Sequence, residues 1–324
     1  MPITSIDTDV EALTMTVVAD FTVPARRLWE AYSDPRQLEK FWGPPDWPAT
    51  FSRHDMAPGG LSRYYMSGPE GQRMNGLWEI IGVDAPRTLE VRDRFAREDG
   101  SVDDDMPSMR VVFAFDDTDA GSRLTTTTWF GSVADLEQLV EMGMEEGLTT
   151  AMGQIDQVLA DLTSFAAGVG TTTQILDDTH IRVSRVIRGP IEKVWDAHHE
   201  PELMKRWLLG PDGWTMPVCD VAASVGDTYR YEWVDENGEN RFGFTGELVE
   251  SAHPYRAVTT EQMIGMDTVT TNELTLIPVD DGTLLSVLIT YPDATTRDII
   301  LATGMTEGME ASYARMESEL MAMA

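Results

Sequence analysis

The sequence predicts an α+β protein made of two tandem domains of one fold, each a curved antiparallel sheet wrapped around a long C-terminal helix. A segment that begins at Pro24, PARRLWEAYSDPRQLEKFWGP, returns at Pro190 as PIEKVWDAHHEPELMKRWLLGP. A shorter one, GMEEG from Gly143, returns as GMTEG from Gly304. Solenoid repeats recur every ~20–50 residues and cannot bury a core singly, so this much longer period indicates two complete domains. We place them at residues 10–164 and 176–324.

Each copy begins with a strand and two short helices. The segment LTMTVVADF (13–21) has the alternation and β-branching of a strand, and Pro24 then opens a helix. Pro35 starts a second helix, which ends before residues 43–45 because Gly-Pro-Pro cannot continue it. The second copy repeats this order over residues 180–211, with a strand, two proline-initiated helices and a Gly-Pro stop.

A series of alternating segments separated by turn residues follows in each copy. Asn237-Gly238 in the second copy is a strong hairpin signal. Short turns between consecutive strands predict an antiparallel meander. Its strands are predicted at LSRYYM, LWEIIGV, TLEVRDRF, MRVVFAF and RLTTTTWF in the first copy, and at TYRYEW, GELVES, AVTTEQM, TNELTLI and LLSVLITY in the second.

Each copy is predicted to close with its longest helix. Ser132 and Asp293 are suited to cap these helices, because their side-chain oxygens can accept from first-turn amides. Apolar residues then recur at helical spacing, which predicts one apolar face directed at the sheet. The two stripes are Met144, Leu148, Ala151, Ile155 and Leu159 in the first copy, and Met305, Met309, Ser312, Met316 and Leu320 in the second.

Composition excludes several function classes. The 55 acidic and 24 basic residues give a formal charge of -31, which repels phosphate backbones and anionic lipid, so we expect neither nucleic acid nor membrane as partner. No apolar run approaches the ~18 residues of a membrane span. The first residues lack a basic region followed by an apolar core, so we expect no secretory signal and a cytoplasmic protein. Cys219 is the single cysteine, and we expect it to be a small core residue.

Several motifs together resemble a known superfamily. They are Pro24 to Trp29, Asp34-Pro35, Phe41-Trp42-Gly43-Pro44, the Pro58-Gly59-Gly60 turn, and Gly143 to Gly147. The chain resembles the START-like, or SRPBCC, superfamily with its helix-grip fold, also seen in the birch pollen allergen. It is most similar to the bacterial domains named after the carboxy-terminal domain of the activator of the heat-shock-protein-90 ATPase. This resemblance implies an apolar ligand cavity between sheet and long helix.

The second copy departs from this pattern at two places. It carries Trp207-Leu208-Leu209-Gly210-Pro211, which is one residue longer, and it replaces the proline-glycine turn with Ser224-Val225-Gly226-Asp227. We therefore do not expect equal ligand preference in the two copies.

Candidate ligand-binding residues follow from the alternation of side chains along a strand, since every second residue faces the helix. The alternative is ordinary core packing, which is common for methionines and aromatics at these spacings. The candidates on the strands are Tyr64, Met66, Tyr229, Tyr231 and Trp233, and those on the helices are Met144, Leu148, Met305 and Met309.

A carboxylate interrupts the apolar face of one strand in each copy. In TLEVRDRF the alternation places Asp93 on that face, and Glu261 is at the aligned position of the second copy. A buried carboxylate must be hydrogen-bonded, paired or protonated, and in a cavity its pKa should rise, which suits acid–base work or the holding of a polar ligand group. The alternative is that both acids lie at the rim. Arg63, Arg92 and Arg94 are expected to face solvent.

No unmistakable catalytic signature is present. His198 and His199 are adjacent, whereas helical ligands of one metal ion want i and i+4 spacing, so we predict no metal, no catalytic residue and no cofactor. The leading hypothesis is binding of a hydrophobic small molecule in one cavity per copy. Whether either copy is an enzyme stays open: one alternative is an enzyme of the cyclase or aromatase kind that uses the cavity carboxylates. The other is a co-regulator of a chaperone ATPase, with the chaperone as partner.

Overall fold

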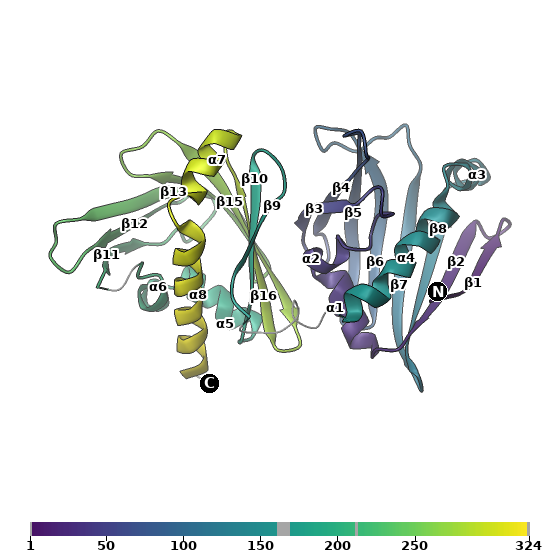
Figure 1. Ribbon diagram of the computed structural model, residues 1–324, viewed down its shortest axis with the longest axis horizontal. Helices are drawn as coiled ribbons and strands as arrows, with labels where there is room; N and C mark the ends of the chain where they lie inside the picture. The colour runs from purple at the N-terminus through teal and green to yellow at the C-terminus, as the bar shows by residue number, and fades with distance from the viewer. Residues whose placement is uncertain (1, 161–168, 211–212, 323–324) are drawn as a thin grey trace. The chain divides into compact units, whose positions relative to one another are not determined.

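Two compact units make up the chain, residues 1–164 and 165–324. The computed structural model describes residues 2–160, 169–210 and 213–322. Each unit contains one 8-stranded antiparallel sheet and a long helix near its end, so the predicted α+β tandem repeat is confirmed (Figure 1). The units are described separately below.

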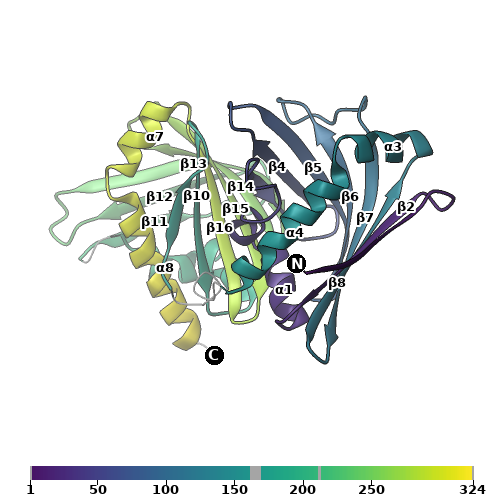
Figure 2. The same cartoon turned by 45° about the vertical axis from the view of Figure 1, so that its right-hand side comes forward.

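The first domain orders its strands β1-β2-β8-β7-β6-β5-β4-β3. Its strands are β1 (Ile3–Asp9), β2 (Thr14–Phe21), β3 (Ala49–His54), β4 (Leu61–Ser67), β5 (Arg73–Asp84), β6 (Thr88–Ala96), β7 (Ser108–Thr118) and β8 (Gly121–Phe130). Its helices are α1 (Ala25–Ser33), α2 (Pro35–Leu38), α3 (Val133–Glu141) and α4 (Met144–Ala160). Figure 1 and Figure 2 both show α4 lying across one face of this sheet.

The second domain orders its strands β11-β12-β13-β14-β15-β16-β10-β9. Its strands are β9 (Thr172–Ile175), β10 (His180–Ile187), β11 (Thr215–Asp220), β12 (Thr228–Val234), β13 (Arg241–Ala252), β14 (Arg256–Met263), β15 (Val269–Val279) and β16 (Gly282–Thr290). Its helices are α5 (Ile191–His199), α6 (Pro201–Trp207), α7 (Ala294–Leu301) and α8 (Met305–Ala322).

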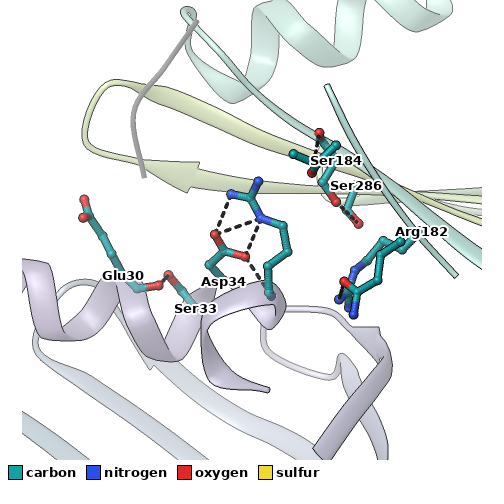
Figure 3. Close-up of polar contacts among 9 residues, drawn as sticks. Glu30, Ser33, Asp34, Arg182, Ser184 and Ser286 are labelled. Atoms are coloured by element: carbon teal, nitrogen blue, oxygen red, sulfur yellow. Dashed lines mark hydrogen bonds and ion pairs between the residues drawn. The ribbon is translucent and has the colours of Figure 1, made fainter. Parts of the chain in front are cut away.

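Local polar contacts fix the ends of these elements. At the start of α2, the Asp34 side chain accepts from the backbone N–H of Arg36 at 2.9 Å and pairs with the Arg36 guanidinium at 2.7 Å (Figure 3). This is the capping role expected of an aspartate before a proline-initiated helix. In the second domain, Ser184 on β10 donates a hydrogen bond to Ser286 on β16 at 3.3 Å, which joins two neighbouring strands (Figure 3).

The closing helix of each copy is two helices rather than one. Ser132 and Asp293 do cap helices, but these are α3 and α7. The helices then end at two glycines in the left-handed region, and α4 and α8 begin after them. These glycines are Gly143, with a φ of 89°, and Gly304, with a φ of 83°. Only glycine adopts this left-handed backbone at no steric cost, so the glycine that opens each repeated pentapeptide ends a helix.

The stripe predicted along these helices is directed into the core at its C-terminal part. Ile155 and Leu159 on α4, like Met316 and Leu320 on α8, are at most 8% exposed. The N-terminal part of the α4 stripe, at Met144 and Leu148, is only partly buried. The start of α4 therefore does not pack tightly on the sheet.

Four strands were not predicted: β1, β3, β9 and β11. Of these, β1 and β9 lie before the expected starts of the domains at residues 10 and 176. β1 pairs with β2, and β9 pairs with β10. Each sheet thus gains an edge strand from the segment that precedes its repeat.

Candidate functional site

A cavity of about 370 Å³ lies in the first domain between the sheet and the α3–α4 region. Ligand pockets typically span ~300–1,000 Å³, so this cavity is large enough for a small organic molecule. Its lining is mainly apolar and includes Phe41, Trp47, Met109, Phe113, Leu139 and Met152.

All five candidates that the sequence suggested in the first domain line this cavity. They are Tyr64, Met66, Asp93, Met144 and Leu148. Tyr64 also packs against Phe51, with stacked rings 5.0 Å apart between centroids, so it is both a core residue and part of the cavity wall. That these side chains bind a ligand stays a prediction.

Asp93 lies in the wall of the cavity, on β6. In the sheet its neighbours are Trp78 on β5 and Met109 on β7. The Tyr64 hydroxyl donates to Asp93 Oδ1 at 3.4 Å, a long and weak hydrogen bond. Burial raises the pKa of Asp93 to about 7, and the contact with Tyr64 and the Arg94 backbone amide offset only part of that effect. Asp93 is therefore partly protonated near neutral pH.

Strand alternation predicted that Arg94 would face solvent, but this residue is not fully solvated. It contributes to the lining of the cavity, and its Nε is buried without a hydrogen-bond partner. Its guanidinium still pairs with Glu79 at 3.5 Å. Arg92, by contrast, is exposed as expected and pairs with the same glutamate at 3.1 Å. The cation of Arg94 is thus partnered by Glu79 and does not neutralise Asp93.

A glycine on β5 allows Tyr64 to lie along the sheet toward Asp93. Gly76 is the register partner of Tyr64, and a Cβ added at Gly76 would overlap the Tyr64 ring. The second domain repeats this glycine–tyrosine arrangement. Gly246 is the register partner of Tyr229, and a Cβ added at Gly246 would overlap the Tyr229 ring. Both domains therefore reserve space for a tyrosine on the inner face of the sheet.

Besides Arg94 Nε, two polar atoms in the cavity wall have no hydrogen-bond partner among the described residues: Trp42 Nε1 and Thr126 Oγ1. The indole N–H of Trp42 lies near enough to the Tyr64 hydroxyl to lower the pKa of Tyr64, but the contact lacks hydrogen-bond geometry. The sequence analysis missed both residues as site residues. Trp42 was noticed only as part of a family motif, and Thr126 could have been found from strand alternation.

In the second domain, Tyr229, Tyr231 and Trp233 belong to, or pack against, a large buried apolar cluster. Trp233 stacks on Phe242 with centroids 4.9 Å apart, and its indole N–H donates to the backbone oxygen of Leu208 at 2.6 Å. These contacts are those of core packing, the alternative named for these positions. Met305 and Met309 are partly buried at the edge of the same cluster.

Glu261 is the second-domain counterpart of Asp93. Burial raises its pKa, while the polar side chains of Asn272 and Tyr229 beside it offset part of this. Its charge also contributes to the raised pKa values of Tyr291 and Tyr313, which places both tyrosines near it. Both acids are half-buried, and burial is the largest cause of the raised pKa in each.

The histidine pair has a structural role in α5. Nδ1 of His198 donates to the backbone oxygen of Val194 at 2.7 Å, and Nδ1 of His199 donates to that of Trp195 at 2.9 Å. Within residues 2–160, 169–210 and 213–322, no group of three or more His, Cys, Asp and Glu side chains could hold a metal ion. Of the helices in these ranges, none is both long and apolar enough to cross a membrane.

Comparison with known proteins gives consistent matches in each half. The family model described as "Activator of Hsp90 ATPase homolog 1-like protein" matches residues 22–160 and 188–321. No curated protein matches the chain.

Solved structures of single-domain size also match. One from Mycobacterium smegmatis is 43% identical over 49% of this chain and 97% of its own length, with a TM-score of 0.46. One from Arthrobacter aurescens is 41% identical over 49% and 92%, with a TM-score of 0.47. A third, from Rhodobacter sphaeroides, is 27% identical over 47% and 99%, with a TM-score of 0.45. With the family model matching most of both halves, the chain belongs to the family of Activator of Hsp90 ATPase homolog 1-like proteins, as a tandem pair of START-like domains.

Proposed function

We propose that the first domain binds a hydrophobic small molecule in the cavity between its sheet and α3–α4. The observation that carries this proposal is a space of about 370 Å³ walled mainly by aromatic and methionine side chains. Removing apolar surface from water is worth ~25 cal/mol per Å², so such a space favours an apolar occupant.

The start of α4 supports entry of a ligand. Gly147 lines the cavity, and a Cβ added there would meet no atom within 4 Å. Met142, beside the α3–α4 break, also lines the cavity and is 47% exposed. Flexible methionines adapt to ligands of different shape. The helix break thus provides an opening with adaptable walls.

Filling that opening tests the proposal. The probe is N-phenyl-1-naphthylamine, a neutral apolar dye whose fluorescence rises when it leaves water. Gly147→Leu places an apolar side chain where the structure has open space, and we expect dye affinity to fall at least tenfold. Gly153→Leu is the matched control, because Gly153 is an exposed glycine of the same helix with equal room for a Cβ. Equal affinity in the two variants would contradict the proposal.

A second candidate function is acid–base catalysis on the bound molecule, in the manner of cyclases and aromatases. Asp93 favours it, because its pKa of about 7 lets the carboxyl both give and take a proton near neutral pH. Titration of the Asp93 carboxyl by ¹³C NMR tests this requirement, and a midpoint near 4 would remove the support. Regulation of a chaperone ATPase would rest on the family's description alone, and we do not propose it for this chain.

A further inference from the structure

Each domain carries a tyrosine beside a carboxyl group on the inner face of its sheet. In the first domain the pair is Tyr64 and Asp93, and in the second it is Tyr229 and Glu261. The two halves have diverged around these positions, since Tyr64 is followed by Tyr65 and Met66 whereas Tyr229 is followed by Arg230 and Tyr231.

The second-domain pair is satisfied within the protein. The single hydroxyl proton of Tyr229 goes to the backbone oxygen of Thr260 at 2.8 Å. Glu261 is stabilised by the Asn272 side chain. Since a typical O–H···O hydrogen bond measures ~2.5–3.0 Å, the Tyr229 contact is a full one. No ligand is needed to pair its hydroxyl.

The first-domain pair is not satisfied in this way. The Tyr64 hydroxyl reaches Asp93 Oδ1 only at 3.4 Å. The indole N–H of Trp42, whose ring centroid lies 6.0 Å from that of Tyr64, is buried without an acceptor. A buried donor without an acceptor loses its hydrogen bond to water and destabilises the protein. Two donors from residues of the cavity wall therefore lack a strong acceptor.

We propose that Trp42 and Tyr64, beside Asp93, form a subsite for the carbonyl oxygen of an apolar ketone. This inference rests on the proposed function and specifies the class of ligand. A carbonyl oxygen has two lone pairs and no proton, so it can accept from the indole N–H and the phenol O–H together. A carboxylate does not suit the subsite, because it would lie beside Asp93 while the nearby Arg94 is paired with Glu79.

The experiment compares two ligands of one shape, 2-acetylnaphthalene and 2-isopropenylnaphthalene, in which a carbonyl oxygen replaces a methylene group. Each is titrated against N-phenyl-1-naphthylamine bound to the full chain, and the readout is the ratio of the two dissociation constants. We expect the wild-type chain to bind the ketone about tenfold more tightly, which corresponds to ~1.4 kcal/mol.

Three variants locate the origin of that preference. Tyr64→Phe and Trp42→Phe each remove one of the two donors and should each reduce the ratio to about twofold or less, while binding of 2-isopropenylnaphthalene persists. Thr127→Val removes a hydroxyl from the opposite face of β8, outside the cavity lining, and should keep the tenfold ratio. The use of two subsite variants keeps the test decisive if one of them does not fold.

The outcomes separate the two proposals. If neither ligand displaces the dye from the wild-type chain, the proposed function itself fails. If both ligands bind equally, or if Thr127→Val lowers the ratio as much as Tyr64→Phe does, the cavity binds apolar molecules but the carbonyl subsite is wrong.

Discussion

Replacing Asp93 with asparagine should stabilise the first domain at alkaline pH and have little effect at acid pH. The pKa of Asp93 rises from 3.8 to about 7 on folding. A carboxyl with a raised pKa contributes fully to stability below pH ~4, and this contribution is lost as pH rises through the folded pKa, because the folded state then holds a buried charge. Asparagine has similar shape and no charge, so the variant escapes that loss.

The size of the effect follows from the two pKa values. At ~1.4 kcal/mol for each pH unit, the interval from 3.8 to about 7 corresponds to roughly 4 kcal/mol. Asp93 faces a cavity that water can enter, which lowers the cost of the buried charge, and we expect about 2 kcal/mol. Tyr64, the titratable group in contact with Asp93, stays neutral because burial raises its own pKa well above the usual value.

Urea unfolding of the full chain at pH 4.5 and pH 8.5 measures this difference. The free energy of unfolding of the first domain, taken from the transition that the substitution moves, should differ between variant and wild type by about 2 kcal/mol more at pH 8.5 than at pH 4.5. Asp105→Asn, which removes a carboxylate that is 94% exposed, is the control and should show no such change. A difference between Asp93→Asn and wild type that does not vary with pH would refute the reasoning.

Three further predictions concern the fold. Gly143→Ala should lower the free energy of urea unfolding by about 1 kcal/mol, because the φ of Gly143 is 89°. Gly153→Ala, inside α4, should raise it by ~0.5–1 kcal/mol. A change of the same sign in both variants would contradict the helix break. Arg185 contacts Glu317 at 2.9 Å, and both side chains are at most 8% exposed. Arg185→Met should therefore destabilise the second domain by ~2–3 kcal/mol. An unchanged unfolding midpoint would show that the pair contributes nothing to stability. Burial raises the pKa of Cys219 to about 11, so iodoacetamide at pH 8 should modify it only after unfolding, and rapid labelling of the folded chain would contradict that burial.

The repeated helices and the meander could be predicted because each depends on local signals. Proline starts α1, α2 and their counterparts, and strand alternation defines β4 to β8. The edge strand β1 escaped prediction because its sequence, ITSIDTD, is mostly exposed and has no regular apolar face; it is held by backbone pairing with β2. The break at Gly143 escaped because an isolated glycine does not reveal its φ.

The candidate site likewise divides into residues that local sequence signals place and residues that depend on distant contacts. Alternation placed Asp93 on the inner face because a strand has a fixed period, and the same rule placed Tyr64 and Met66. The unpaired indole N–H of Trp42 could not be predicted, because Trp42 lies after α2 and the atoms near it come from distant strands. The difference between the domains was equally hidden, since it depends on whether Tyr229 reaches the backbone of Thr260.

Methionine-methyl NMR tests most directly whether the first-domain cavity takes an apolar ligand. The full chain is labelled with ¹³C at its methionine methyl groups and titrated with 2-acetylnaphthalene. Met66, Met109, Met144 and Met152 line the cavity, so their signals should shift together and saturably, while buried Met316 in the second domain should not move. Unchanged signals from these four methionines at saturating ligand, or shifts confined to the second domain, would contradict the account.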